Sequence, residues 1–273
     1  MPEQSWTTAV GEVGHGVVNV RGYPLTDIIR SLSFADATFL TIRGELPTPA
    51  QSRTFEAALN GILEHGFYAP TTLAARMVAS AAPESVIPGV AAGMLTIGSI
   101  TVSPQHTAEV IDEIEAAVVG GSTPEAAVDA YVSRMQAAKK RMPGIGHPLH
   151  PEGDPRAIAL REVAEANGVW GTRAGYYFAA KDEYLRRIGR DFPVNIDGML
   201  GCVLSELGFR PLEMPGIAAI SFMPGIVAHC VEELLAPPTL RVAEGVYHGH
   251  AERRLNGSST FGADGARREH AQK

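Results

Sequence analysis

The residues best suited to chemistry lie close together in one segment, which reads GIGHPLHPEGDPR and spans positions 144 to 156. His147 follows a Gly-Ile-Gly sequence, and the missing side chains let backbone N–H and C=O groups approach a ligand closely. Arg156 follows an Asp-Pro pair that is typical of a helix start, so its guanidinium and the helix dipole could bind a carboxylate together. The residue types alone also fit an ordinary surface loop in which Arg156 is a solvated first-turn residue.

A second candidate is Asp197, in the segment PVNIDGMLG. An acidic residue in the first turn of a helix most often complements the helix dipole. Apolar neighbours such as Ile196 and Met199 could instead tune its basicity for proton transfer at carbon. Local sequence leaves both interpretations open.

The elements that must position these residues are predicted to be helices, so the fold class is mainly α. Four segments place Ser, Thr or Asp before a proline, which predicts a side-chain N-cap with proline at the first helical position. They are Thr48-Pro49, Ser103-Pro104, Thr123-Pro124 and Asp154-Pro155. Only VVNVRGY, residues 17–23, alternates like a strand, and it predicts a short hairpin or edge strand at most.

The composition argues against two classes of partner. The chain of 273 residues carries a net charge of −7, whereas nucleic acids and anionic membranes are bound by clustered Lys and Arg, so we expect neither partner. We find no uninterrupted run of about 18 apolar residues and no basic-then-apolar leader, and we expect a cytoplasmic location. Cys202 and Cys230 lie in apolar helical patterns without metal-ligand spacing, which indicates buried free thiols.

Four segments, in the same order, resemble motifs of the citrate synthase superfamily. GIGHPLHPEGDPR is similar to GFGHRVY…DPR, with the His-to-Arg spacing kept, and NIDG is similar to the catalytic NVD element. RGYPLTDIIRSLSFADATFLTIRGELPT resembles the N-terminal RGY…F-E…L…G-LPT region, and GIVAHCVEELLAPPTLR resembles the late G-x-x-A-H-x-x-E helix and the arginine after it. The resemblance covers residues 15–245 and is nearest the short citryl-CoA lyases and the citrate-synthase-like module of ATP-citrate lyase.

The resemblance implies a citrate-synthase-like fold of two helical domains with a shortened large domain. Residues 1–103 and 216–253 would form the large domain, and residues 104–215 the small domain. Residues 254–273 would be a mobile tail. The resemblance also implies a homodimer or a higher homo-oligomer.

The resemblance further implies an enzyme that forms or breaks a carbon–carbon bond of a CoA thioester. Citryl-CoA, or a related 3-hydroxyacyl-CoA, would be cleaved to acetyl-CoA and a 2-oxo acid such as oxaloacetate. Asp197 would carry protons to or from the acetyl methyl carbon, and His147 would hydrogen-bond the carbonyl or hydroxyl oxygen. Arg156 would hold a substrate carboxylate, and Arg241 would reach the site of the partner subunit.

The glycine loop Gly144, Ile145 and Gly146 would, by the same resemblance, lie against the CoA nucleotide. Coenzyme A would enter and leave as a substrate and product thioester, and no metal is expected. His229 matches the family's helix histidine, which could contact substrate or make an inter-helix hydrogen bond.

The active-site pattern departs from the family at two positions. Thr101 aligns with the histidine of the family's H-G-G segment, which stabilises the enol oxygen of the thioester; His106, five residues later, is a possible substitute. Phe222 aligns with the late-helix arginine that clamps a substrate carboxylate. A phenyl ring cannot pair with a carboxylate, so either another basic group supplies that charge or the substrate has an apolar group there.

Two alternatives to a citryl-CoA lyase stay open. The chain could be a repurposed family member that cleaves a non-citrate β-hydroxy or β-keto substrate, or a non-catalytic acyl-CoA-binding protein. The joint presence of His147, Arg156 and Asp197 favours an enzyme.

Overall fold

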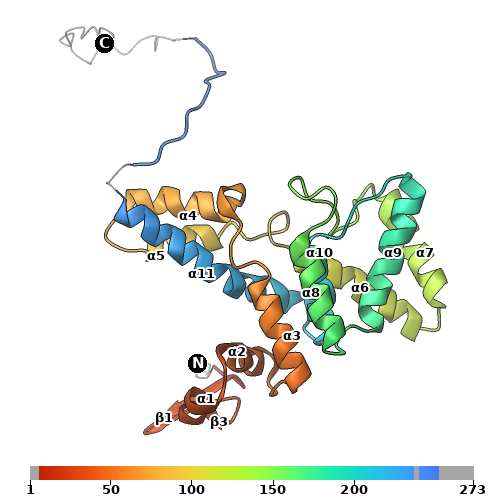
Figure 1. Ribbon diagram of the computed structural model, residues 1–273, viewed down its shortest axis with the longest axis horizontal. Coiled ribbons are helices and arrows are strands. Elements are labelled where there is room, and N and C mark those ends of the chain that lie inside the picture. Colours follow the sequence, from red (N-terminus) through yellow and green to blue (C-terminus); the bar gives the residue numbers. More distant parts are fainter. Residues whose placement is uncertain (1–5, 237–239, 252–273) are drawn as a thin grey trace, which may run out of the picture. The chain divides into compact units, whose positions relative to one another are not determined.

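The computed structural model describes residues 6–236 and 240–251. Contacts divide the chain into two units, Met1–Arg241 and Val242–Lys273. Every helix and strand of the described residues belongs to the first unit (Figure 1). The predicted mobile tail, residues 254–273, lies outside the described residues.

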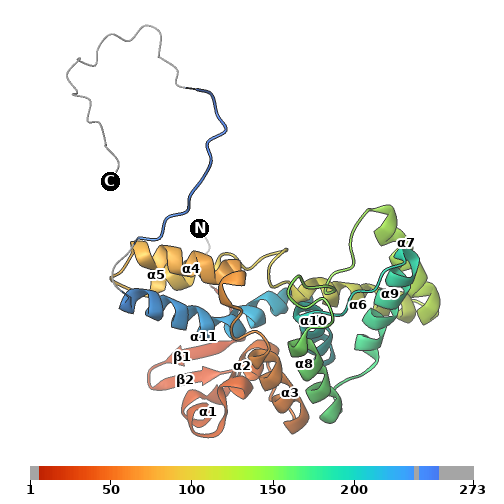
Figure 2. The ribbon, with the colours of Figure 1, turned by 45° about the horizontal axis from the view of Figure 1, so that its top comes forward.

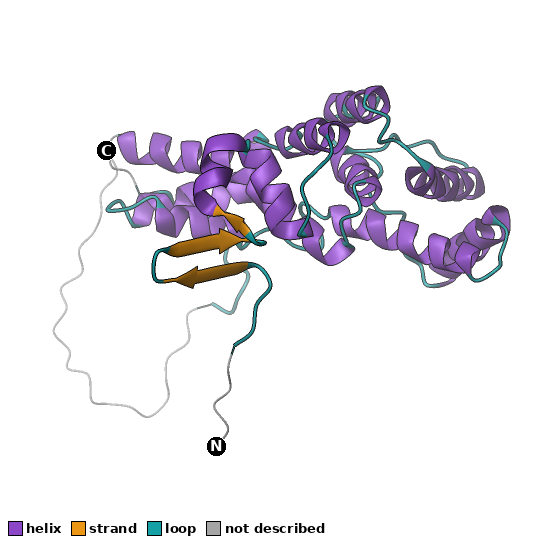
Figure 3. Cartoon of the chain, turned by 90° about the horizontal axis from the view of Figure 1, so that it is seen from below, coloured by secondary structure: helices purple, strands orange, loops and turns teal. Residues whose placement is uncertain are grey.

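A small antiparallel sheet precedes the helices, in the order β1 (Gly11–Gly14), β2 (Val17–Val20) and β3 (Tyr23–Pro24) (Figure 3). Gly14 pairs with Val17, so a two-residue turn joins the first two strands. The alternation in residues 17–23 therefore predicted β2 correctly. It could not predict β1, because GEVG is rich in glycine and carries no alternating pattern.

The rest of the described first unit is helical, which confirms the predicted fold class. The α-helices are α1 (Leu25–Ser31), α2 (Phe34–Arg43), α3 (Pro49–Asn60), α4 (Pro70–Ala81), α5 (Ile87–Met94), α6 (Pro104–Val119), α7 (Pro124–Ala137), α8 (Pro155–Ala166), α9 (Thr172–Ile188), α10 (Ile196–Glu206) and α11 (Met214–Leu235). Two 3-10 turns, η1 (Gly66–Tyr68) and η2 (Pro211–Glu213), precede α4 and α11. In Figures 1 and 2, α4 and α5 lie beside α11, in agreement with the contacts among these three helices.

Three of the four predicted side-chain caps are present. Thr48, Thr123 and Asp154 each accept a hydrogen bond from a first-turn backbone N–H. Ser103 precedes α6 as predicted, but its side chain makes no cap hydrogen bond. Its backbone N–H donates instead to Asp197, so this position links α6 to α10.

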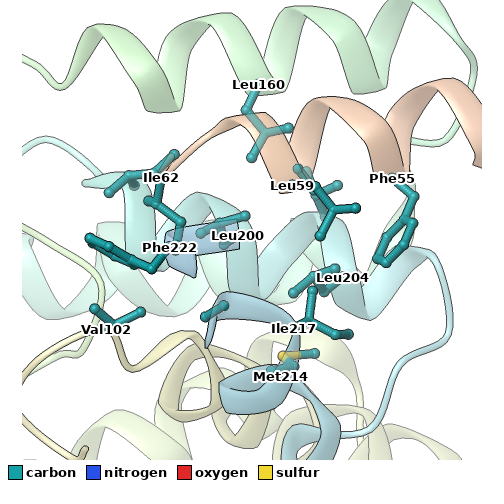
Figure 4. Close-up of a cluster of buried hydrophobic side chains, with 14 of the residues drawn as sticks. Phe55, Leu59, Ile62, Val102, Leu160, Leu200, Leu204, Met214, Ile217 and Phe222 are labelled. Carbon is teal, nitrogen blue, oxygen red and sulfur yellow. The ribbon is translucent and has the colours of Figure 1, made fainter. Parts of the chain in front are cut away.

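Helix α10 is the centre of the packing, and its buried residues contribute to two hydrophobic clusters. The first cluster joins α10 to α2, α3, α8 and α11; Figure 4 shows ten labelled members, among them Phe55, Leu204 and Phe222. The second cluster is built by α6, α7, α9 and the Cys202 face of α10. The second cluster lies wholly within residues 104–215, but the contacts join both clusters in one unit, so the two-domain division stays a prediction.

Both cysteines, Cys202 and Cys230, are buried free thiols, as predicted.

The late helix, α11, lies in an unusually apolar segment. The segment Pro211–Leu235 has a mean hydropathy of 1.6 in its most apolar window and is, by length and composition alone, long enough to cross a membrane. The search for an uninterrupted apolar run does not detect this segment, because Gly, Ser and His residues interrupt it. Ile217, Phe222 and Ile226 of this segment pack into the first cluster, which is the behaviour of a core helix.

The glycine loop before His147 is fastened to the segment that enters α10. Ile145 forms an isolated antiparallel bridge with Val194, and Asn195 donates its backbone N–H to the carbonyl of Gly144 (2.9 Å). Gly144 has a φ of 74°, and a Cβ there would lie 2.5 Å from Cα of Gly198. Two glycines thus let the loop and the first turn of α10 touch at backbone distance.

We expect Gly144→Ala to lower the free energy of unfolding by about 2–5 kcal/mol, because it adds a methyl group to a filled space and strains a positive φ. Gly168→Ala is the matched control, since Gly168 has a φ of 68° but open space around its Cα. The control should lose about 1 kcal/mol. Urea unfolding followed by circular dichroism measures both, and equal losses would show that the close approach is not what requires glycine.

Candidate functional site

A cavity of about 240 Å³ lies where the ends of several helices meet. Its wall includes five of the predicted site residues, Thr101, His147, Arg156, Asp197 and Phe222. The remaining described lining residues are Ile62, His65, Tyr68, Ala69, Pro70, Ile100, Val102, Asn195 and Ile196. The structure therefore brings the segments GIGHPLHPEGDPR and PVNIDGMLG together at one cavity.

The Asp154 carboxylate organises the polar side of this cavity. It is 1% exposed and accepts hydrogen bonds from backbone N, Nε and Nη2 of Arg156 at 3.1, 3.0 and 2.8 Å. Its Oδ2 also accepts from the backbone N–H of Ile196 at 3.0 Å. Burial by itself raises the pKa of Asp154, but the hydrogen bonds and charge of Arg156 and the Ile196 N–H together lower it. The ionised carboxylate holds Arg156 in one orientation and joins the N-termini of α8 and α10.

Two histidines lie beside this arginine with their tautomers determined by their neighbours. Leu149 donates its N–H to Nδ1 of His147 at 3.2 Å, so a neutral His147 carries its proton on Nε2. Arginine can only donate, so Nδ1 of His65 accepts from Nη1 of Arg156 at 3.2 Å, and a neutral His65 also carries its proton on Nε2. The two Nε2 atoms are 3.2 Å apart. Two Nε2–H groups at this separation repel each other while no acceptor lies between them, so an acceptor oxygen of a ligand placed between the rings would bond both and relieve the contact.

The environment keeps both imidazoles neutral near pH 7. Burial, the charge of Arg156 and the neighbouring His147 lower the pKa of His65. Burial, His150 and Arg156 lower the pKa of His147, whose ring stacks on that of His150 at 4.8 Å. The pair thus offers N–H dipoles rather than positive charge.

Asp197 has the opposite shift. Burial raises its pKa, against the lowering effects of the Ser103 N–H, which donates to Oδ2 at 3.3 Å, and of Arg156. A carboxylate with a raised pKa is a stronger base, as proton abstraction from carbon requires. Asp197 also lines a second cavity of about 590 Å³, together with Gly144, Lys140 and Arg141. Asp197 therefore borders two cavities.

Comparison with known protein families identifies the family of this chain. Residues 53–242 match the family model for the C-terminal domain of citrate synthase, and every predicted site residue lies within that range. The chain belongs to the citrate synthase family.

Relatives of this citrate synthase family member include both full-length citrate synthases and a shorter lyase. The chain is 26% identical over 200 residues to citrate synthase 2 of Bacillus subtilis, covering 73% of this chain and 52% of that protein. It is 28% identical over 231 residues to the citrate synthase of Acidithiobacillus ferridurans, covering 82% and 57%. The chain thus spans about half the length of the citrate synthases that it matches.

A solved structure of similar size matches almost end to end. Citryl-CoA lyase from Hydrogenobacter thermophilus superposes with a TM-score of 0.82 and 33% identity, over 92% of this chain and 97% of that chain. ATP citrate lyase from Methanothrix soehngenii, in complex with citrate and coenzyme A, gives a TM-score of 0.75 at 20% identity, over 92% of this chain and 43% of that chain. The latter likeness shows the fold alone. The predicted membership of the superfamily, near citryl-CoA lyase, is confirmed.

Three of the predicted substrate-binding residues lie outside the first cavity. His106 lines the second cavity, and its Nδ1 lies 3.1 Å from Glu109. His229 hydrogen-bonds Glu64, in the loop after α3, through Nε2 (2.7 Å), and its Nδ1 accepts from Nη1 of Arg76 on α4 (3.4 Å), which is the inter-helix role that the sequence left open. Arg241 is held by Glu233 (2.6 Å), so its predicted reach into a partner's site stays a prediction.

The glycine loop faces two spaces. Gly144 lines the second cavity, whereas Ile145 and Gly146 line a third of about 410 Å³ that also contains Arg141 and Arg190. Cationic side chains therefore line both of the cavities that border the glycine loop.

His65 is the site residue that sequence reasoning missed. It follows α3 in the segment EHGFY, whose one signal is a His-Gly pair after a helix end. Tyr68, from the same segment, lies with its ring 5.7 Å from the rings of both His65 and His147. Within the described residues, no group of three or more His, Cys, Asp or Glu side chains could hold a metal ion, and the expectation of a metal-free site stays a prediction.

We expect Asp154→Asn to lower the free energy of unfolding by about 1.5–3 kcal/mol at pH 7, because charge-assisted hydrogen bonds are lost. The pKa of Asp154 is lower in the folded state than in the unfolded state, where it is near 3.9. The greater stability of the wild type relative to Asp154→Asn is therefore fully present above the unfolded-state pKa, and it is lost as the pH falls through the folded-state pKa. Urea unfolding at pH 7 and at several values below 4 measures this convergence. Asp27→Asn, at an exposed pair with Arg30, is the control and should change stability by less than about 0.5 kcal/mol. A difference that does not depend on pH would contradict this role of Asp154.

Proposed function

We propose that this chain is an enzyme of the citryl-CoA lyase type, which cleaves a 3-hydroxyacyl-CoA to acetyl-CoA and a 2-oxo acid, or runs the reverse reaction. The observation that carries the proposal is the shared cavity of Asp197, Arg156 and the His65–His147 pair. This cavity combines a carboxylate of raised pKa, a guanidinium and two converging N–H donors. Family membership and the match to a citryl-CoA lyase of nearly the same length support it.

Proton transfer at carbon is assigned to Asp197. In the synthetic direction its carboxylate removes a proton from the acetyl methyl group, and the resulting enolate carbon attacks the oxo carbon of the acid. The oxo oxygen becomes an alkoxide, which the Nε2–H groups of His65 and His147 stabilise before it takes up a proton from water. Cleavage follows the same steps backward, and Asp197 then returns the proton to the acetyl carbon.

The carboxylate of the 2-oxo acid is assigned to Arg156. Two of its nitrogens bind Asp154, and Nη1 donates to Nδ1 of His65, the ring nitrogen other than the proposed oxyanion donor Nε2. The hydroxyl of Thr101, on the same cavity wall, is a donor for the thioester oxygen in place of the family's histidine.

The CoA part is assigned to the cavities beside the glycine loop. Lys140, Arg141 and Arg190 line these two cavities, and their charges suit the phosphates of CoA. Asn195 Nδ2 donates to the carbonyl of Gly146 at 2.8 Å and keeps the loop in place. A homodimer to which Arg241 contributes across the interface, and a cytoplasmic location, complete the proposal.

Asp197→Asn is expected to reduce turnover by about 10²–10⁴-fold without unfolding the protein, because an amide cannot carry the proton. Exchange of the acetyl-CoA methyl protons in D₂O, followed by NMR, isolates this step. The wild-type exchange rate should rise with pH through a value above the ordinary 3.8 of an aspartate, since the ionised form is the base and its pKa is raised.

Asp27→Asn, which changes an exposed aspartate of α1, serves as the control and should exchange at the wild-type rate. Undiminished turnover in Asp197→Asn would disprove the mechanism. Calorimetric binding of acetyl-CoA without any exchange by the wild type would instead favour the non-catalytic acyl-CoA-binding alternative.

A further inference from the structure

We propose that His150 is a positioning residue for His147, because its stacked ring takes up the proton that would otherwise displace His147 from the site. This inference rests on the proposed function and deepens it by naming the residue that keeps the hydrogen-bond donors in place as the pH falls. It depends on the stack of the two rings, on the hydrogen bonds that require neutral histidines, and on the charges around them.

His147 and His150 belong to one turn of the loop before α8. His150 donates its backbone N–H to the carbonyl of His147 at 3.1 Å, and Gly153 donates to the carbonyl of His150 at 3.2 Å. This turn stacks the two imidazole rings, with centroids 4.8 Å apart and planes inclined by 27°. A charge on either ring therefore acts strongly on the other.

The hydrogen bonds of His147 require its neutral form. Nδ1 accepts the backbone N–H of Leu149 at 3.2 Å. A cationic imidazole carries a hydrogen on both ring nitrogens, so two donors would then face each other. Relief of that contact requires the turn with Leu149 and His150 to open, which moves the ring of His147 relative to His65. Protonation of His147 therefore disrupts the geometry of the site as well as its charge.

His65 is subject to the same constraint. Its Nδ1 accepts from Nη1 of Arg156 at 3.2 Å, so a hydrogen on Nδ1 would face the guanidinium. A positive charge on His150 lowers the pKa of His65 as well as that of His147. One protonated ring beside the pair thus protects both Nε2–H donors. His150 is not among the described residues that line the first cavity, so its own protonation leaves the donors of that cavity unchanged.

Charged and titratable side chains approach His147 from three parts of the fold. They are His150, Asp154 and Arg156 of the loop and α8, His65 and Tyr68 of the segment between α3 and α4, and Asp197 of α10, which lines the same cavity. Glu152, in the same loop, is exposed. Burial is the largest cause that lowers the pKa of His147, and the charge of His150 is the next. Arg156 and Asp154 act on this pKa in opposite directions, so His150 is the neighbour whose change of charge protects His147.

The test follows the imidazole resonances of the full-length protein, labelled with ¹³C in histidine, by NMR between pH 5 and pH 8. His147→Gln and His150→Phe assign the two signals. In the wild type, the signal of His150 should respond before that of His147 as the pH falls. In His150→Phe, the midpoint of His147 should move to higher pH by at least about 0.5 pH unit, because two unit charges 4.8 Å apart interact by about this much even in water.

Two further variants separate charge from packing. His150→Gln removes the ring together with the charge, and it should raise the midpoint of His147 as His150→Phe does. His15→Phe, in the exposed turn between β1 and β2, is the control and should leave that midpoint unchanged. If neither variant of His150 folds, the order of protonation in the wild type still decides. A His147 that responds before His150, or a midpoint that does not move when His150 is replaced, would overturn the inference.

The pH profile of turnover connects the proton to the reaction. Relative to the wild type, the loss of kcat/KM in both variants of His150 should be at least about twofold greater at pH 5 than at pH 8. An equal loss at every pH would show that His150 acts by packing alone and would contradict the inference.

Failure of the inference can be told apart from failure of the proposed function. If no CoA thioester turns over and acetyl-CoA shows no methyl exchange, the proposed function fails, whereas the NMR titration still decides the role of His150. Each variant is compared with the wild type in the same assembly, so a cation contributed by a partner subunit acts equally on both.

Discussion

The Asp154 carboxylate, with four hydrogen bonds in a buried position, determines where the rest of the site can be. Burying a carboxylate is unfavourable unless each oxygen is paired, and here the partners come from the starts of two helices. Ile196, one of those partners, immediately precedes Asp197 in the chain. The same carboxylate therefore sets the direction of the Arg156 fork and the place of the proposed base. The carboxylate that caps α8 therefore also connects Arg156 to the first turn of α10, which carries Asp197.

Arg156 transmits this arrangement to the electrostatics of the cavity. Burial raises the pKa of Asp197 and lowers that of His65 and His147, and the charge of Arg156 lowers all three. The net shifts are therefore in opposite directions within one cavity. Titratable groups whose pKa values are shifted apart in this way can take different roles in one site. The carboxylate of raised pKa becomes suited to moving a proton, and the neutral imidazoles become suited to donating hydrogen bonds. Because the tautomers follow from Leu149 and Arg156, the donors are in place before a ligand arrives.

Sequence reasoning succeeded where the governing interactions are local. The Asp154-Pro155 cap, the placement of Asp197 in the first turn of a helix and the loop before His147 all depend on residues within a few positions of one another. It missed His65, whose contact with His147 joins positions 82 residues apart and leaves no periodic signal. It also gave Ser103 a side-chain cap, because the competing demand of Asp197 for a backbone N–H comes from 94 residues away. Long-range pairing of polar groups is set by tertiary packing, which a single sequence does not display.

The apolar side of the first cavity, formed by Phe222, Ile62 and Val102, is also part of the hydrophobic core. Phe222 is 4% exposed and belongs to the same cluster as Ile62, Leu200 and Ile217, so it is at once a cavity wall and a core side chain. Removing such a ring costs about 3–5 kcal/mol in typical cores. An arginine at this position would need both a substrate carboxylate and room for its stem, or it would bury an uncompensated charge. A change in the acid that binds would therefore require repacking of α11 against α3, whereas Asp154, Arg156 and Asp197 could remain as they are. The polar half of the site and the apolar half are thus free to change separately, because different elements hold them.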